Sequence, residues 1–255
     1  MSAIMVFSHP NHEISVLGTI GRKSPHVVFL TDGGGEERVR ETQEGLSSYL
    51  PFENLHFLGH SEQSLYDALV NHDREFFWNL AREVREVVDL IRPSEIYCDA
   101  IEFYNPVHDM ALPIVRAALG AREDVAVLEV PLIYQERSEP DSYALQQIPP
   151  SLAHLSVSVM LTGVELDRKM AVLRSGGYQA LLRQLGDRIR DAIDARPQRE
   201  NFLQARASLP SPAPDQVPRY DMRGQALKAR GEVQDAISYH QHYAPMFVSL
   251  CPELA

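Results

Sequence analysis

The chain has 255 residues, 44% hydrophobic and 23% charged, which fits one globular domain with a full core. Its net charge of −11 opposes nucleic-acid binding, and no lysine or arginine run compensates. No apolar run approaches the roughly 18 residues that cross a bilayer, and the N-terminus lacks a signal-peptide pattern. We therefore expect a soluble cytoplasmic protein without a transmembrane segment, in which Cys98 and Cys251 are buried free thiols.

Short β-branched or aromatic runs alternate with helical segments in the first half of the chain. This alternation predicts an α/β fold with a Rossmann-like, mostly parallel sheet and helices on both faces. The predicted strands are residues 4–8, 26–31, 54–58, 95–98 and 125–130. The predicted helices are residues 36–49, 64–91 and 107–119, the second of which ends before Pro93.

The pattern changes after about residue 150. One more strand is predicted at residues 157–164, and a long helix at 166–195 that is interrupted at Gly176-Gly177. Four prolines make residues 209–219 an extended loop. His240 and His242 share a face only if their segment is extended, and we expect a surface loop there. Because no internal repeat is present, we interpret residues 1–255 as a single domain with a C-terminal elaboration.

The most informative stretch is residues 9–13 (His-Pro-Asn-His-Glu), directly after the first predicted strand. Ligand sites in open α/β sheets lie at the carboxyl ends of strands. Two imidazoles three residues apart on a proline-containing turn can both face one divalent cation. Catalytic zinc sites use three protein ligands and leave one position open. The third candidate ligand is His108, which follows another predicted strand.

Five sequence blocks within the first 135 residues support a more specific hypothesis. They are Ser8-His9-Pro10-Asn11-His12-Glu13, Thr31-Asp32-Gly33, Arg38 with Glu41, Phe57-Leu58-Gly59 with Glu62, and Pro106-Val107-His108. In this order the blocks resemble those of the PIG-L/LmbE-like family of zinc-dependent de-N-acetylases. Any one block alone is weak evidence, but five in the right order are hard to obtain by chance.

The resemblance implies that His9, His12 and His108 bind Zn²⁺ and that the chain removes an acyl group, usually acetyl, from an amino sugar or related amine. The family's second ligand is an Asp, so His12 replaces an anion with a neutral imidazole, similar to the three-His site of carbonic anhydrase. Asn11 stands where the family has an Asp that takes a proton from the metal-bound water. An amide cannot do this, and general base catalysis contributes about 10²–10⁴-fold. We therefore expect slower hydrolysis, which Asn11→Asp would accelerate.

Three acidic residues could replace the missing base: Asp32, Glu13 and Asp109. Each has a structural alternative, namely a turn or helix cap for Asp32, an imidazole partner for Glu13, and a helix-dipole contact for Asp109.

The remaining candidates lie at family positions that face the substrate. Asn105 replaces a His that steadies the oxyanion and can still donate a hydrogen bond. Arg38 and Glu62 stand where the family contacts polar substrate groups, and a plain surface charge is the alternative for Arg38. Tyr104 lies beside Phe103, which occupies a position that is often Tyr in the family, so Tyr104 is a candidate substrate contact.

Three functions remain open from the sequence. The first is a metal-dependent amide hydrolase acting on a small-molecule amino sugar or glycoconjugate. The second, favoured by Asn11, is a catalytically lapsed relative that binds a sugar-like ligand or a protein partner. The third is a different hydrolytic or redox reaction, since three histidines also suit copper or iron. The sequence leaves open whether the chain forms a homo-oligomer.

Overall fold

A seven-stranded sheet forms the centre of the computed structural model, which describes residues 2–134, 144–174, 178, 198–212 and 217–254. Its strand order is β3-β2-β1-β4-β5-β9-β8. The strands are β1 (Ala3–Phe7), β2 (His26–Thr31), β3 (Leu55–His60), β4 (Glu95–Asp99), β5 (Ala126–Val130), β8 (Ser156–Met160) and β9 (Arg199–Gln204). The first five run parallel, β9 is antiparallel to β5, and β8 is antiparallel to β9. The expectation of an α/β fold with a mostly parallel sheet is confirmed.

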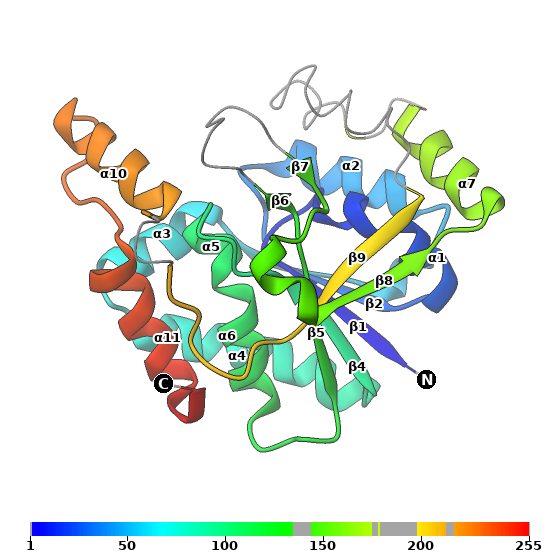
Figure 1. The fold of residues 1–255 in the computed structure, drawn as a ribbon, viewed down its shortest axis with the longest axis horizontal. Coiled ribbons are helices and arrows are strands. Elements are labelled where there is room, and N and C mark those ends of the chain that lie inside the picture. Colours follow the sequence, from blue (N-terminus) through cyan, green and yellow to red (C-terminus); the bar gives the residue numbers. More distant parts are fainter. Residues whose placement is uncertain (1, 135–143, 175–177, 179–197, 213–216, 255) are drawn as a thin grey trace.

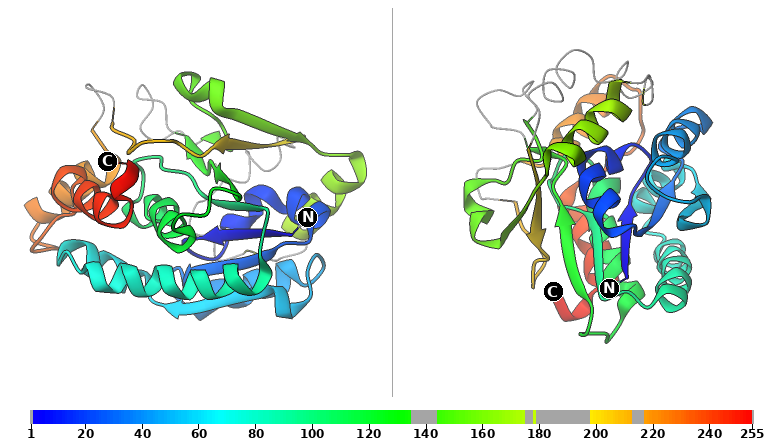
Figure 2. Two further views of the ribbon diagram at one scale, coloured as in Figure 1. Left: turned by 90° about the horizontal axis from the view of Figure 1, so that it is seen from below. Right: turned by 90° about the vertical axis from the view of Figure 1, so that its right-hand side faces the viewer.

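Helices cover both faces of this sheet (Figure 1 and Figure 2). The α-helices are α1 (Leu17–Lys23), α2 (Glu36–Leu46), α3 (Glu62–Val70), α4 (Arg74–Ile91), α5 (Pro106–Asp109), α6 (Ala111–Leu119), α7 (Gly163–Arg174), α10 (Arg219–Ala229) and α11 (Ala244–Leu250). Shorter elements are the 3₁₀ helices His12–Val16, Phe52–Asn54, Pro150–Leu155 and Pro252–Leu254, the π-helix Tyr239–Tyr243, and the β6–β7 pair Ile133–Tyr134 and Ala144–Leu145.

The alternation of side chains along β1 creates two hydrophobic cores. Ile4 and Val6 join α3, α4, α6 and α11 in one core. Met5 and Phe7 join α1, α2 and α7 in the other. Successive strand residues point to opposite faces, so a strand covered on both sides is apolar throughout, as β1 is.

The register places the carboxyl ends of three strands side by side. Phe7 of β1 pairs with Phe29 of β2, and Val6 pairs with Cys98 of β4. The loops that follow β1, β2 and β4 therefore emerge next to one another. This edge is where a ligand site is expected in such a sheet.

Several element boundaries differ from the sequence prediction. The single helix at 64–91 is wrong, because the chain breaks between Val70 and Arg74, where His72 has φ 53° and the Asp73 carboxylate accepts the Phe76 N–H. The predicted strand at 157–164 ends early at Met160. The following helix is confirmed as far as Arg174, and the rest of the predicted helix lies outside the described residues except at residue 178. The sequence analysis missed β9.

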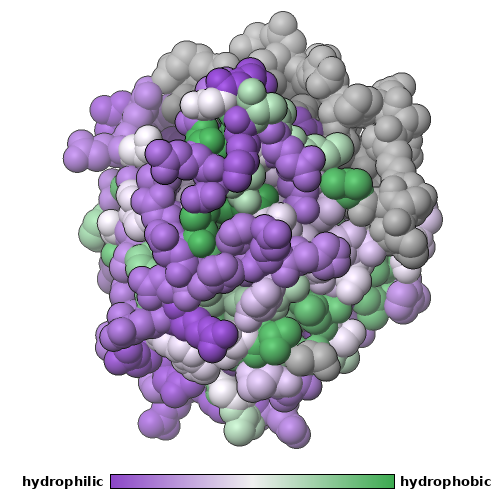
Figure 3. Space-filling model, turned by 90° about the vertical axis from the view of Figure 1, so that its left-hand side faces the viewer, coloured by the Kyte–Doolittle hydropathy of each residue, from purple (hydrophilic) through white to green (hydrophobic). Residues whose placement is uncertain are grey.

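The C-terminal segment packs against α4 and α6. The expected surface loop at 239–243 is wrong, since this stretch is a π-helix that buries Tyr239 and Tyr243 in the core. The described residues of the proline-rich stretch form neither helix nor strand before α10 begins at Arg219. The side of the molecule that carries α10 and α11 is mostly hydrophilic, with hydrophobic residues in separate groups (Figure 3).

Two further features of the described residues are the state of the two cysteines and the length of the helices. Cys98 and Cys251 are buried and not disulfide-bonded, as expected. Among the described residues, no helix is long and apolar enough to cross a membrane.

Candidate metal centre

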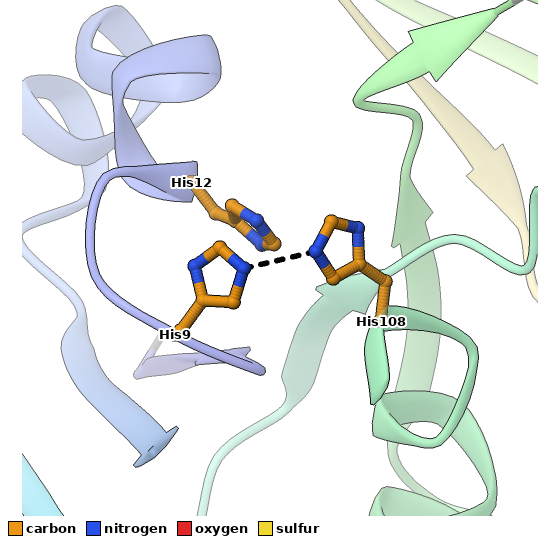
Figure 4. Close-up of side chains that lie close together, drawn as sticks. All are labelled: His9, His12 and His108. Carbon is orange, nitrogen blue, oxygen red and sulfur yellow. Dashed lines mark hydrogen bonds between the residues drawn. The ribbon is translucent and has the colours of Figure 1, made fainter. Parts of the chain in front are cut away.

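Three buried histidines converge at the carboxyl edge of the sheet (Figure 4). His9 and His12 come from the turn and 3₁₀ helix after β1, and His108 comes from α5 after β4. The Nε2 atoms of His9 and His108 lie 2.9 Å apart, and the ring centre of His12 lies 3.9 Å from that of His9 and 4.3 Å from that of His108. Two nitrogens on one tetrahedral zinc are about 3.3 Å apart, given bonds of 2.0–2.1 Å. The cluster therefore has the dimensions of a site for one divalent cation.

Local backbone conformation brings the first two histidines together. Asn11 adopts the left-handed region with φ 81°, which asparagine tolerates better than most residues. The loop after β2 then closes over His9 at Gly33, which has φ 64°. A side chain at Gly33 would come within 3.0 Å of the His9 Cβ, so this approach requires glycine.

In His9 and His12, the Nδ1 nitrogen has a hydrogen-bond acceptor. We call Nδ1 the outer nitrogen of these rings and Nε2 the inner nitrogen. His9 Nδ1 lies 3.1 Å from the Pro10 carbonyl, and His12 Nδ1 lies 2.9 Å from Asp99 Oδ2. Donation from Nδ1 leaves Nε2 as the lone-pair nitrogen, an arrangement typical of zinc-bound histidines. His108 differs, because its Nδ1 is buried without a hydrogen-bond partner in the described part of the chain.

Asp99 is a site residue that the sequence analysis missed. Its Oδ2 also accepts the Ser8 N–H at 2.7 Å and the Ser8 hydroxyl at 2.6 Å, and the side chain is fully buried. The sequence places this acid at the end of a predicted strand, but only the structure shows that the strand lies next to β1 and so brings Asp99 to the edge that carries His9 and His12.

Two of the three histidines are held in the neutral form. Burial lowers the pKa of His9 and His108 well below the usual value, and the neighbouring histidines and the positive charge of Arg38 add to this. Neutral imidazole is the form that binds a metal.

Arg38 and Asn11 form one hydrogen-bonded unit beside the histidines. Arg38 Nε donates to Asn11 Oδ1 at 2.7 Å, and Arg38 Nη1 donates to the Gly33 carbonyl at 2.8 Å. Asn11 is buried and bonds to Thr42 through its backbone N–H and its side-chain amide. Arg38 is therefore part of the site's surroundings rather than a plain surface charge.

The three candidate replacement bases are engaged elsewhere. Asp32 accepts the backbone N–H groups of Gly34 at 2.9 Å and Glu62 at 3.2 Å. Glu13 accepts the Thr42 hydroxyl at 2.7 Å, and burial raises its pKa. The carboxylate that bonds to the imidazole of a candidate ligand, His12, belongs to Asp99. The structure therefore does not show Glu13 in its alternative role as an imidazole partner.

The third candidate base, Asp109, holds the loop that leads to His108. Its carboxylate accepts the N–H groups of Glu102 at 2.9 Å and Phe103 at 3.2 Å. Burial is the largest influence on its pKa, which is raised to about 8. The side chain therefore stabilises the backbone at the end of β4.

The candidate substrate contacts lie next to α5. Asn105 caps this helix by accepting the Val107 N–H at 2.9 Å, and its Oδ1 also accepts the Tyr66 hydroxyl at 3.1 Å. Glu62 Oε1 accepts from the same Tyr66 hydroxyl at 3.3 Å and lies 3.5 Å from Asn105 Nδ2. Tyr66 is a second residue that the sequence analysis missed.

The C-terminal elaboration reaches this region. The Tyr104 ring centre lies 6.2 Å from that of His108, and the Arg219 guanidinium lies 4.9 Å from the Tyr104 ring centre. The backbone N–H of Arg219 also donates to the Phe103 carbonyl at 2.8 Å. This reach was not predicted, because nothing local in the sequence links residue 219 to residue 104.

Comparisons with known proteins give a fold-level likeness. No family model matches the chain, and no curated protein matches it in sequence. The chain is similar to a deacetylase of the teicoplanin biosynthesis pathway, with 14% identity over 80% of this chain and 97% of that chain and a TM-score of 0.54. It is also similar to a deacetylase–teicoplanin complex (12% identity, 80% and 97% coverage, TM-score 0.52) and to the A40926 pseudoaglycone deacetylase Dbv21 (12%, 79% and 96%, 0.51). At these identities the likeness shows a shared α/β fold.

Proposed function

We propose that this chain is a metal-dependent amide hydrolase that removes an acyl group, most simply acetyl, from an amino sugar or related small amine. The observation that carries the proposal is the buried convergence of His9, His12 and His108 at the carboxyl edge of the sheet. The fold supports it, since the similar solved structures include deacetylases. It also agrees with the resemblance to the PIG-L/LmbE-like family.

The residues present fit zinc. Three imidazole nitrogen donors with an open fourth position are a ligand set of catalytic zinc sites, and Asp99 holds His12 in the orientation that such ligands need. Zinc bound there would polarise the amide carbonyl and lower the pKa of a water molecule. Glu62 and Tyr104 lie around α5, where we propose that they contact the polar groups of the substrate.

We propose that the chain is a slow hydrolase. Asn11 cannot accept a proton, and its amide oxygen already accepts from Arg38. Asp32 and Asp109 accept backbone N–H groups and Glu13 accepts the Thr42 hydroxyl, so the carboxyl groups of all three candidate bases already have hydrogen-bond partners. The usual contribution of a carboxylate base, about 10²–10⁴-fold, would then be missing.

A second candidate function follows from the same observation. If the Arg38–Asn11 unit serves binding alone, the chain is a catalytically lapsed relative that holds a sugar-like ligand. In that case the metal site persists while amine release is absent.

The test combines metal analysis with an amine-release screen. Freshly purified protein should contain one zinc per chain and should release primary amine from at least one N-acetyl sugar. His108→Ala should lose both properties, while His56→Ala, a change at the opposite edge of the sheet, should keep them. Metal content without amine release would favour the lapsed relative, and a native protein that takes up no metal would contradict both functions.

A further inference from the structure

We infer that Asn11 and Thr42 are positioning residues that aim the Arg38 guanidinium at the histidine cluster, where it binds a negatively charged oxygen of the acyl group or of the carboxylate product. This inference rests on the proposed function, because it assigns Asn11 a task at the same site. It gives a physical reason for an amide at the position where the family has an acid.

The hydrogen-bond pattern around Thr42 explains why the side chain must be an amide. The Thr42 hydroxyl donates to Glu13 Oε1 at 2.7 Å, so its single hydrogen is committed. The same oxygen accepts the Asn11 backbone N–H at 3.1 Å and the Asn11 Nδ2 at 3.4 Å. Asn11 must therefore present a donor toward Thr42.

On its other side, Asn11 must present an acceptor. Arg38 has donors only, and its Nε lies 2.7 Å from Asn11 Oδ1. An amide satisfies both neighbours at once. A carboxylate at the same place would set an oxygen against the lone pairs of the Thr42 hydroxyl.

These contacts fix the direction of the guanidinium. Arg38 and Thr42 lie four residues apart on α2, which places them on the same helix face. Nε bonds to Asn11 and Nη1 bonds to the Gly33 carbonyl, so two donors on different nitrogens hold the guanidinium plane. Gly33 in turn lies against the His9 side chain.

Within the described part of the chain, the charge of Arg38 lacks a direct counter-ion. Among the residues that the structure describes, no carboxylate forms an ion pair with it, although Glu62, Glu13, Glu41 and Asp32 act on it from further away. The Arg38 side chain is half-buried, so its charge is partly removed from water, and this burial lowers its pKa. A desolvated guanidinium with fixed geometry is a binding group for a carboxylate or other anionic oxygen.

The alternative donor at this edge is already engaged. Asn105 stands where the family places its oxyanion-stabilising His, but its side-chain oxygen caps α5 and accepts from Tyr66. Its Nδ2 lies 3.5 Å from Glu62 Oε1. Arg38 is therefore the better placed group for negative charge near His9 and His108.

Acetate is the probe for this inference, because it is the expected carboxylate product and carries the charge that Arg38 would bind. Calorimetry on the zinc-loaded protein should show acetate binding that weakens about five-fold in Thr42→Val, the loss expected for one well-placed hydrogen bond. Thr42→Ser keeps the hydroxyl and should stay within about two-fold of the native affinity. Arg38→Gln, which removes the charge, should lose more than Thr42→Val.

One control variant tests for a purely structural effect of losing a buried hydroxyl, and a second variant tests the Asn11–Arg38 contact by another route. Thr19→Val removes another buried hydroxyl that donates to a carboxylate, Glu200 at 2.6 Å, and should leave acetate affinity unchanged. Asn11→Gly removes the amide while tolerating the left-handed backbone, so it tests the same contact if Thr42→Val fails to fold.

A spectroscopic signature makes the test independent of catalysis. In metal-free protein with ¹⁵N-labelled arginine, Arg38 Nε–H should give a resonance protected from exchange, because it donates to buried Asn11. This protection should disappear in Asn11→Gly and Thr42→Val and return in Thr42→Ser. Unchanged protection and acetate affinity in both disrupting variants would overturn the inference.

The outcome for the hydrolase is separate. A native protein that binds acetate through Arg38 but releases no amine would refute the proposed reaction and leave the positioning role standing. An active protein whose KM and kcat are unaffected by Asn11→Gly would refute the positioning role and leave the hydrolase standing.

Discussion

The two edges of the sheet each bring histidines together, in different ways. At the carboxyl edge, His9, His12 and His108 are buried, and the outer nitrogens of the first two have acceptors. At the amino edge, His26 of β2 and His56 of β3 are half-buried and stack, with ring centres 5.3 Å apart, and His26 Nδ1 lies 3.0 Å from His56 Nε2.

The difference shows what turns neighbouring histidines into a candidate metal centre. His26 and His56 satisfy each other, so their close nitrogens share one hydrogen. In the buried cluster, Pro10 and Asp99 take the Nδ1 hydrogens of His9 and His12, which leaves the Nε2 nitrogen of each of these two rings with a lone pair for a metal. Proximity alone is therefore weaker evidence for a metal than the direction in which each ring is held.

The largest effect on zinc binding should come from removing one of the three candidate ligands. His108→Ala should abolish stoichiometric zinc binding while the protein stays folded, because two imidazoles are too few for a catalytic zinc site. His56→Ala should retain full metal content. Elemental analysis after dialysis, with circular dichroism as the folding check, makes the measurement. Full metal in His108→Ala would remove that residue from the ligand set.

The next effect should come from the acceptor behind His12. Asp99→Asn should lower zinc affinity about 10–100-fold, the usual cost of losing a carboxylate that orients a ligand histidine. Asp32→Asn is the matched control, since the Asp32 carboxylate bonds to the backbone of Gly34 and Glu62. Competition with a chromophoric chelator gives both affinities. Equal affinities in the two variants would show that Asp99 does not orient a ligand.

Much of the fold was predictable because its signals are local. The buried parallel strands read as apolar runs, and all five predicted at residues 4–130 are present within two residues at either end. What failed depends on distant partners. The β9 sequence Arg-Glu-Asn-Phe-Leu-Gln has no clear alternation, and Glu200 within it is buried only because Lys169 and the start of α1 surround it. The single-domain interpretation stays a prediction.

The site was predictable where ligands follow strands and unpredictable where tertiary contacts assign a role. His9, His12 and His108 were named from their positions and from the family resemblance, and the structure brings them together. Asp99 and Thr42 were missed, since their importance lies in hydrogen bonds across strands and helices. For Asp32 the sequence left a catalytic role and a turn open; its carboxylate accepts the Gly34 N–H, as a turn requires, and the catalytic role stays untested.

A smaller effect separates two accounts of Asn11. If this position only lacks a base, Asn11→Asp should raise amine release, by as much as the 10²–10⁴ range. If Asn11 anchors Arg38 as we infer, the new carboxylate faces the Thr42 lone pairs, so we expect no gain in rate. We also expect a loss of about 1–3 kcal/mol in the free energy of unfolding, the cost of an unsatisfied buried polar contact. Initial rates and urea unfolding of the two proteins measure both quantities, and a large gain in rate would refute the anchoring account.

The smallest effect concerns the histidine pair at the amino edge. Burial lowers the pKa of His26 and His56 below 6.5, and the charge of His26 adds to the shift of His56. A folded-state pKa below the unfolded value means that the unfolded chain binds protons more readily, so this contribution to stability is present above about pH 6.5 and is lost as the pH falls through the folded pKa. His26→Gln removes one titrating group and relieves the other, so its Tm should fall less than that of the native protein between pH 7.5 and 5. The exposed His154→Gln is the control, and the other histidines cancel in the difference between proteins. Identical pH dependence in His26→Gln and native protein would show that the pair titrates as in the unfolded chain.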